Sequence, residues 1–267
     1  MSTAAVLPAP RLLARWRELV WPREHGSWSL ALEPVALGLL VAPSAAGACL
    51  AGAVLAAFFA RRPLRTAVGD ATPARCIEAL GPLAALVAVA FAAILGVIAV
   101  SGVAWMAWLV PAAIAGAAFL YFDLRSEGRA EAAEVAGAAA FAFLPAAFVA
   151  LAHGGAAKSL AVALLMLGCA VPAVLTVRAA LRAAKTGVLR RAPALATSAI
   201  ALAAAAILAR ENLAPLAALV LLAILALRTL ALLVWPRPAW RARTLGMIEA
   251  ALGVVFVVTL SGAWLAA

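Results

Sequence analysis

Residues Ala214–Val234 read APLAALVLLAILALRTLALLV, an apolar run in which Arg228 is the only charged side chain. A transmembrane α-helix needs about 20 consecutive apolar residues, so this run predicts a membrane-spanning helix. The rest of the chain is similar, because 68% of its 267 residues are hydrophobic, 12% are charged and the mean hydropathy is +1.12. A soluble domain of this length needs more polar surface, so we predict an all-α polytopic membrane protein.

Nine apolar runs of this kind lie between short charged segments. They cover residues 27–42, 44–60, 76–100, 102–122, 135–152, 159–177, 193–209, 214–234 and 244–266. The second run is near the lower length limit for a transmembrane helix. We therefore predict nine transmembrane helices that form one membrane domain over residues 27–267.

Residues 1–26 precede the first run and have a different pattern. The stretch RLLARWRELVW at residues 11–21 places Leu12, Trp16 and Leu19 on one helical face, with charged side chains opposite. This pattern predicts an amphipathic helix that lies on the cytoplasmic face of the membrane. A disordered tail is the alternative. Arginines interrupt any apolar core of a signal peptide, so we expect the first membrane segment to be retained.

The positions of the basic residues predict the orientation of the chain. If the N-terminus is cytoplasmic, 18 of the 21 Lys and Arg residues fall in cytoplasmic segments, and the outer loops hold only Lys158 and Arg210. Cytoplasmic loops of membrane proteins carry an excess of Lys and Arg. We therefore expect a cytoplasmic N-terminus and an external C-terminus. The net charge of +10 reflects this topology and an attraction to anionic lipid, not to nucleic acid.

Three charged residues lie inside predicted spans at a similar depth. Glu33 is about 8 Å from the inner end of its helix, and Arg228 and Glu249 are each about 10 Å from theirs, at 1.5 Å per residue. Because a charge at the centre of a membrane helix costs about 2.5 to 3.5 kcal/mol, these side chains should face the protein interior and pair. They predict either a structural ion pair that joins helices or the wall of a functional cavity.

Arginines occupy the inner ends of the second and sixth spans, in FFARRPLR (58–65) and TVRAALRAAKTG (176–187). In each stretch two arginines have the i, i+4 spacing of one helical face. The planar guanidinium group binds phosphate or carboxylate through two hydrogen bonds and stays charged, so two such faces could form an anion site. The candidate residues are Arg61, Arg62, Arg65, Arg178 and Arg182. The alternative is that these arginines only satisfy the topology.

Three other features suggest weaker candidates. His25 could transfer protons, although a hydrogen-bonding role at the membrane interface is the alternative. Asp123, Glu127 and Glu131 are four residues apart and could bind Mg²⁺ or Ca²⁺, but interleaved arginines favour a solvated loop of mixed charge. The three cysteines lack CxxC spacing and are interpreted as packing residues. We therefore predict no metal site and no cofactor.

Three stretches resemble the YwiC-like family of bacterial membrane proteins. They are REHGSWSLALEP (23–34), FFARRPL (58–64) and LGMIEAALGVVF (245–256). The resemblance extends over nearly the whole chain. It implies a location in the bacterial cytoplasmic membrane and names no reaction.

The order of these features also resembles the UbiA-type intramembrane prenyltransferases, which implies a UbiA-like bundle of nine helices. In that family, aspartate-rich motifs at the inner ends of spans two and six hold Mg²⁺ against a prenyl diphosphate. Here the same places read RRPLR and VRAALRAAKTG, and the chain has only two aspartates, Asp70 and Asp123. The resemblance therefore implies a shared scaffold in which arginines bind an anion directly, without a metal.

Together these patterns predict a cavity that is open to the cytoplasm and binds a membrane lipid or a phosphorylated lipid-like ligand. The arginines of spans two and six would hold its phosphate or diphosphate, while Glu33, Arg228 and Glu249 would organise the wall. A transporter of small anions is one alternative and a metal-dependent prenyltransferase is another. Whether the protein is an enzyme, and its oligomeric state, are left open by the sequence.

Overall fold

The computed structural model of the protein describes residues 16, 18–21, 26–69, 72–128, 130–235 and 242–266. Within these ranges the chain forms helices and no strand. The helices are α2 (Gly26–Val41), α3 (Ala45–Gly69), α4 (Pro73–Ser101), η1 (Ala104–Leu109), α5 (Val110–Leu124), α6 (Glu131–Ala142), α7 (Leu144–Leu151), α8 (Ala156–Thr186), α9 (Ala192–Arg210), α10 (Leu216–Val234) and α11 (Ala242–Ala266). The predicted all-α class is confirmed.

Each predicted span coincides with one helix or with two consecutive helices. In the described part of the chain, eight helical segments are long and apolar enough to cross a membrane, with η1–α5 and α6–α7 each counted as one. The first predicted span, α2, has 16 residues, or about 24 Å, and is shorter than the hydrocarbon core of about 30 Å. Most of the predicted interfacial helix at residues 1–26 lies outside the described residues.

Two helices extend further than the apolar runs predict. α3 continues past residue 60 to Gly69, and α8 continues past residue 177 to Thr186. Alanine and arginine both favour helix, so the helix does not end where the apolar run ends. α8 stops at Gly187, whose φ of +72° is a left-handed conformation that favours glycine. The arginine-rich stretches are therefore helical turns, not loops.

Two predicted spans are interrupted, each close to a proline. The fifth span divides at Phe143 because Pro145, in the first turn of α7, has no N–H group to continue the hydrogen bonds of α6. The fourth begins as the 3₁₀-helix η1 and becomes α-helical at Val110, just before Pro111. Proline is well tolerated in the first turn of a helix.

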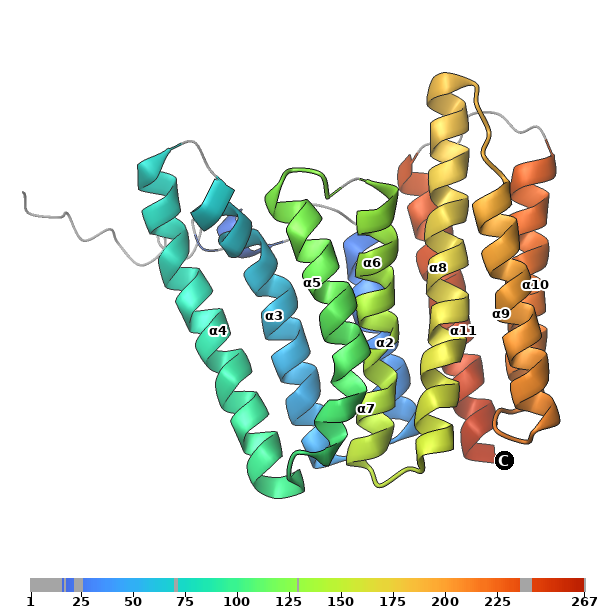
Figure 1. The fold of residues 1–267 in the computed structure, drawn as a ribbon, viewed down its shortest axis with the longest axis horizontal. Helices are drawn as coiled ribbons and strands as arrows, with labels where there is room; N and C mark the ends of the chain where they lie inside the picture. The colour runs from blue at the N-terminus through green and yellow to red at the C-terminus, as the bar shows by residue number, and fades with distance from the viewer. Residues whose placement is uncertain are drawn as a thin grey trace, which may run out of the picture.

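The helices form a bundle in which α8 is central and packs against α6, α7, α9, α10 and α11 (Figure 1). α4 packs along α3 at one side of the bundle, and α9 and α10 form the other side. The C-terminal end of α11 lies at the opposite end of the bundle from the end of α8. We call the end at which α3, α5 and α8 terminate the basic end, because Arg65, Arg182 and Lys185 lie there.

The half of the bundle away from the basic end is closely packed. One core cluster includes Leu37, Leu165 and Phe256, and a second is centred on Phe148. A β-carbon at Gly38 would lie 2.6 Å from the Phe148 ring, so glycine is what lets α2 approach α7 this closely. The helices separate toward the basic end, where a cavity forms.

Candidate functional site

A cavity of about 1490 Å³ lies within the bundle, and most of the helices contribute to its lining. Its charged residues lie toward the basic end, and along η1 and α5 it extends to Leu109 and Ala112 near the opposite end. Ligand pockets commonly have volumes of about 300 to 1,000 Å³, so this one is large. Apolar residues such as Leu30, Phe58, Phe119, Phe141 and Val174 form much of its wall. The charged residues in the lining are Glu33, Arg61, Arg65, Asp123, Glu134, Arg178, Arg182, Lys185, Arg228 and Glu249.

Seven of the residues predicted from the sequence line this cavity: Glu33, Arg61, Arg65, Arg178, Arg182, Arg228 and Glu249. Arg62 does not. It follows Arg61 by one position, about 100° around the helix, and its Nη1 donates a hydrogen bond of 2.5 Å to the carbonyl oxygen of Trp21. Its assignment to the anion site therefore has no support from the cavity lining and stays a prediction. His25 lies outside the described residues.

Arg61 is held in place by Asp123 at the end of α5. Its Nε and Nη2 donate to the two carboxylate oxygens at 3.0 Å each, and its guanidinium carbon lies 4.6 Å from the centre of the Phe119 ring. The Arg65 Nη1 is 3.9 Å from the same carboxylate. Asp123 is only 2% exposed, and a β-carbon at Gly128 would lie 2.5 Å from its Oδ1. The interpretation of Asp123 as part of a solvated loop was therefore wrong.

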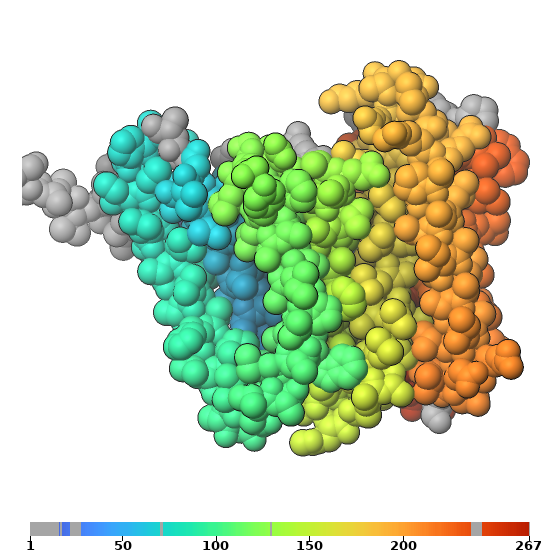
Figure 2. All heavy atoms as spheres, viewed as in Figure 1, coloured from blue at the N-terminus to red at the C-terminus, as the bar shows by residue number. Residues whose placement is uncertain are grey.

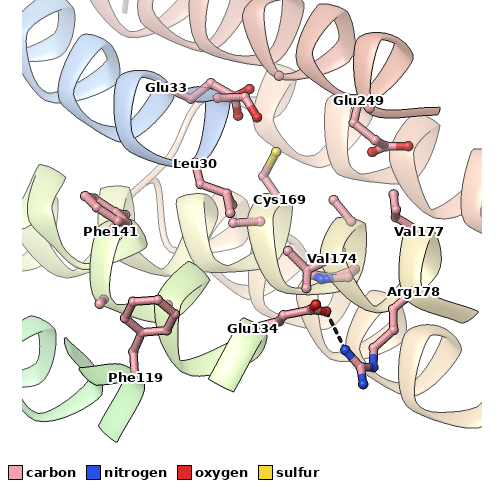
Figure 3. Close-up of a pocket in the computed structure, with 18 of the residues that line it drawn as sticks. Leu30, Glu33, Phe119, Glu134, Phe141, Cys169, Val174, Val177, Arg178 and Glu249 are labelled. Carbon is pink, nitrogen blue, oxygen red and sulfur yellow. Dashed lines mark hydrogen bonds and ion pairs between the residues drawn. The ribbon is translucent and has the colours of Figure 1, made fainter. Parts of the chain in front are cut away.

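Arg178 on α8 is held in a similar way by the first turn of α6. Its Nη1 donates to Glu134 Oε2 at 2.6 Å (Figure 3). Its Nε lies 3.6 Å from Glu131 Oε2. Acidic residues are favoured at a helix N-terminus because of the helix dipole. The sequence interpretation overlooked Glu134, although its i, i+3 spacing from Glu131 at a helix start was a usable signal.

Arg182 and Lys185 lie beyond Arg178 on α8 and are exposed. Neither forms an ion pair with any residue in the described ranges. The Arg65 side chain is 52% exposed and shares Asp123 with Arg61. After Asp123 and Glu134 have each been paired with an arginine, the basic end of the cavity retains excess positive charge.

The expected contact between Arg228 of α10 and Glu249 of α11 is present as an ion pair, with each side chain 14% exposed. Arg228 Nη1 also lies 3.4 Å from the hydroxyl of Thr229, which is 3.1 Å from the hydroxyl of Thr176 on α8. Arg228 Nε and Glu249 Oε1 are buried without a hydrogen-bond partner in the described structure. The ion pair joins α10 and α11. One N–H donor of Arg228 and one carboxylate oxygen of Glu249 remain without a hydrogen bond among the described residues.

Glu33 does not join this pair. Its carboxylate lies against Gly253 of α11, and it forms no ion pair or hydrogen bond with the residues that the structure describes. Gly253 is one helical turn beyond Glu249, so the Glu33 carboxylate lies about 6 Å deeper than Glu249 and not level with it as predicted. Figure 3 shows Glu33 and Glu249 on one side of the cavity and Arg178 on the other.

The acidic residues do not gather into a metal centre within the described part of the chain. No three His, Cys, Asp or Glu side chains come together there in a way that could hold a metal ion. Asp123 and Glu131, two members of the acidic series, contact different arginines instead.

Comparison with known families bears on the same region. The model of the YwiC-like protein family matches residues 21–149. Over these residues the chain is YwiC-like. The resemblance drawn from REHGSWSLALEP and FFARRPL is confirmed, since this YwiC-like segment contains the whole of both stretches. It also contributes Glu33, Arg61, Asp123 and Glu134 to the cavity.

The remainder of the comparison adds no relative. No curated protein and no solved structure matches the chain. The UbiA-like arrangement therefore stays a prediction.

Proposed function

We propose that this YwiC-like membrane protein binds an anionic amphiphile, whose phosphate or diphosphate group lies at the basic end of the cavity and whose apolar part lies between the helices. The observation that carries this proposal is the excess positive charge in the cavity lining, from Arg65, Arg182 and Lys185. A cavity lined by charges of one sign attracts ligands of the opposite sign, so excess positive charge at this end favours an anion.

Arg61 and Arg178 would also bind the anionic group, because their guanidinium groups are held in a fixed orientation. Their carboxylate partners fix the two guanidinium groups, and Arg61 keeps N–H donors beyond the two that bind Asp123. Guanidinium groups bind phosphate through paired, charge-assisted hydrogen bonds, which are stronger than those between neutral groups. Asp123 and Glu134 thus act as positioning residues, and anion binding by this set would not require a divalent metal.

The apolar wall favours an amphiphile over a small free anion. Side chains such as Leu30, Phe58, Phe141 and Val174 would contact hydrocarbon, not phosphate. Figure 2 shows a hollow between α4 and α5 with α3 behind it, and α3 and α5 both contribute to the cavity lining. The closely packed half of the bundle around Phe148 and Leu165 also disfavours a transport path for a charged solute.

By the positive-inside rule the cavity would face the cytoplasm of a bacterial cell.

The proposal can be tested by measuring the affinity of the purified protein for a fluorescent phosphatidic acid and a fluorescent prenyl diphosphate, with and without EDTA. The double substitution Arg182→Gln/Lys185→Gln removes charge without leaving a buried acid unpaired. Charge-assisted hydrogen bonds contribute about 1.5 to 3 kcal/mol, so we expect the affinity to fall by at least about tenfold.

Arg75→Gln is the matched control. Arg75 is exposed near the start of α4, at the same end of the bundle, and does not line the cavity. Its substitution should leave the affinity unchanged, and chelation should have no effect on the wild-type protein. Equal binding by the double variant and the wild type, or binding that disappears in EDTA, would contradict the proposal.

A further inference from the structure

The side of the cavity formed by α2, α10 and α11 differs from the basic end. Arg228 and Glu249 line the cavity, are 14% exposed and form an ion pair. Even so, Arg228 Nε and Glu249 Oε1 have no hydrogen-bond partner among the described residues. Buried polar groups are nearly always hydrogen-bonded, so one unused donor and one unused acceptor side by side point to a ligand group that supplies both.

Glu33 adds a second acceptor on the same wall. Its carboxylate forms no hydrogen bond or ion pair with the described side chains and rests on Gly253, about 6 Å along α11 from Glu249. A second anion would be repelled by the two carboxylates, and a cation would meet the guanidinium group of Arg228. A hydroxyl group, which both donates and accepts, fits this set of neighbours best.

The two sides of the cavity lie at a similar depth in the bundle. Thr176, which contacts Thr229 next to Arg228, is two residues from Arg178 on α8. Two residues correspond to about 3 Å along the helix axis and about 200° around it. Val174 and Val177 line the cavity between these two sides (Figure 3).

We propose that Glu33, Arg228 and Glu249 form a second subsite, which binds the hydroxyl groups of a polyol esterified to the phosphate at the basic end. This inference rests on the proposed function and narrows its ligand class to phosphorylated polyols. The polyol phosphate is the headgroup of a lipid such as phosphatidylglycerol or a free polyol phosphate. Both offer the same chemistry to the subsite.

The test compares dioleoyl phosphatidylglycerol with dioleoyl phosphatidylethanol, which has the same acyl chains and the same phosphodiester charge but no hydroxyl group. Affinities for the detergent-solubilised full-length protein would be measured by native mass spectrometry. We expect the wild-type protein to prefer phosphatidylglycerol by about tenfold, because two or more additional hydrogen bonds form. Competition by sn-glycerol 1-phosphate distinguishes the two sources. If the site accepts the free polyol phosphate, this compound should reduce the binding of phosphatidylglycerol; if the site requires a lipid, it should not.

The double substitution Arg228→Met/Glu249→Leu removes the donor and the acceptor together and leaves no unpaired charge, so the fold should be kept. It should abolish the preference between the two lipids. Glu33→Met, of similar length, is a second and independent variant that should reduce the preference several-fold. Arg75→Gln should retain the wild-type preference.

Each other outcome has a distinct meaning. If the wild-type protein binds both lipids equally, or if the double variant keeps the preference, the polyol subsite is refuted and the proposed function stands. If the wild-type protein binds neither lipid but binds the fluorescent phosphatidic acid or prenyl diphosphate, the polyol subsite is refuted and the proposed function stands. If it binds none of the four compounds, the proposed function fails and the subsite fails with it.

Discussion

Individual charged residues in this protein are stabilised in pairs that join different helices. Arg61 contacts Asp123, Arg178 contacts Glu134 and Arg228 contacts Glu249. Because a buried charge without a partner is costly, each pair makes its two helices depend on one another. The Arg228–Glu249 pair lies deepest in an otherwise apolar pair of helices and should be the most sensitive to substitution.

At this residue scale, Arg228→Glu should lower the yield of folded protein sharply. The change places a third carboxylate beside Glu249 and near Glu33, and breaking a buried ion pair typically costs about 3 to 5 kcal/mol. The measurement is the monodisperse fraction in size-exclusion chromatography after detergent extraction. The charge swap Arg228→Glu/Glu249→Arg should recover much of the yield. A normal yield from the single variant would show that the pair contributes little.

At the element scale, α2 and α11 pack against each other where the Glu33 carboxylate contacts Gly253. Gly253→Ala would place a methyl group in the space of that carboxylate, so the buried Glu33 side chain would have to move away from α11. We expect a lower melting temperature, measured from tryptophan fluorescence, since overpacking typically costs about 1 to 3 kcal/mol. Alanine favours helix over glycine by about 1 kcal/mol, so without the contact to Glu33 the substitution should raise the melting temperature. A lower melting temperature would therefore report the contact.

Gly262→Ala is the control for this prediction, because nothing lies within 4 Å of a β-carbon at Gly262 on the same helix. It should leave the melting temperature unchanged or raise it. Combining Gly253→Ala with Glu33→Ala should restore stability beyond the sum of the two single changes, as expected for residues in contact. Strict additivity would mean that the two residues do not interact.

At the scale of the whole molecule, the arrangement of helices predicts which ends share one side of the membrane. Gly187, just after α8, and the C-terminal end of α11 lie at opposite ends of the bundle (Figure 1). With the basic end in the cytoplasm, green fluorescent protein fused after Gly187 should fluoresce, and alkaline phosphatase fused after residue 267 should be active. Activity of alkaline phosphatase at both positions would contradict this orientation.

The sequence by itself determined the class of the fold and the approximate limits of its helices, because transfer from water to lipid depends on local composition. The same argument identified Glu33, Arg228 and Glu249 as residues that need protein surroundings. It also located the arginine-bearing turns, since a regular helix converts i, i+4 spacing into one face.

The tertiary structure alone decided which partners these residues have. Asp123 reaches Arg61 across 62 positions of sequence, and Glu134 reaches Arg178 across 44. In a membrane protein, the lipid-facing and protein-facing sides of a helix are both apolar, so hydrophobic periodicity does not reveal which helices are neighbours. The excess charge at the basic end follows from that packing, because only packing decides which arginines are neutralised and which remain available to a ligand.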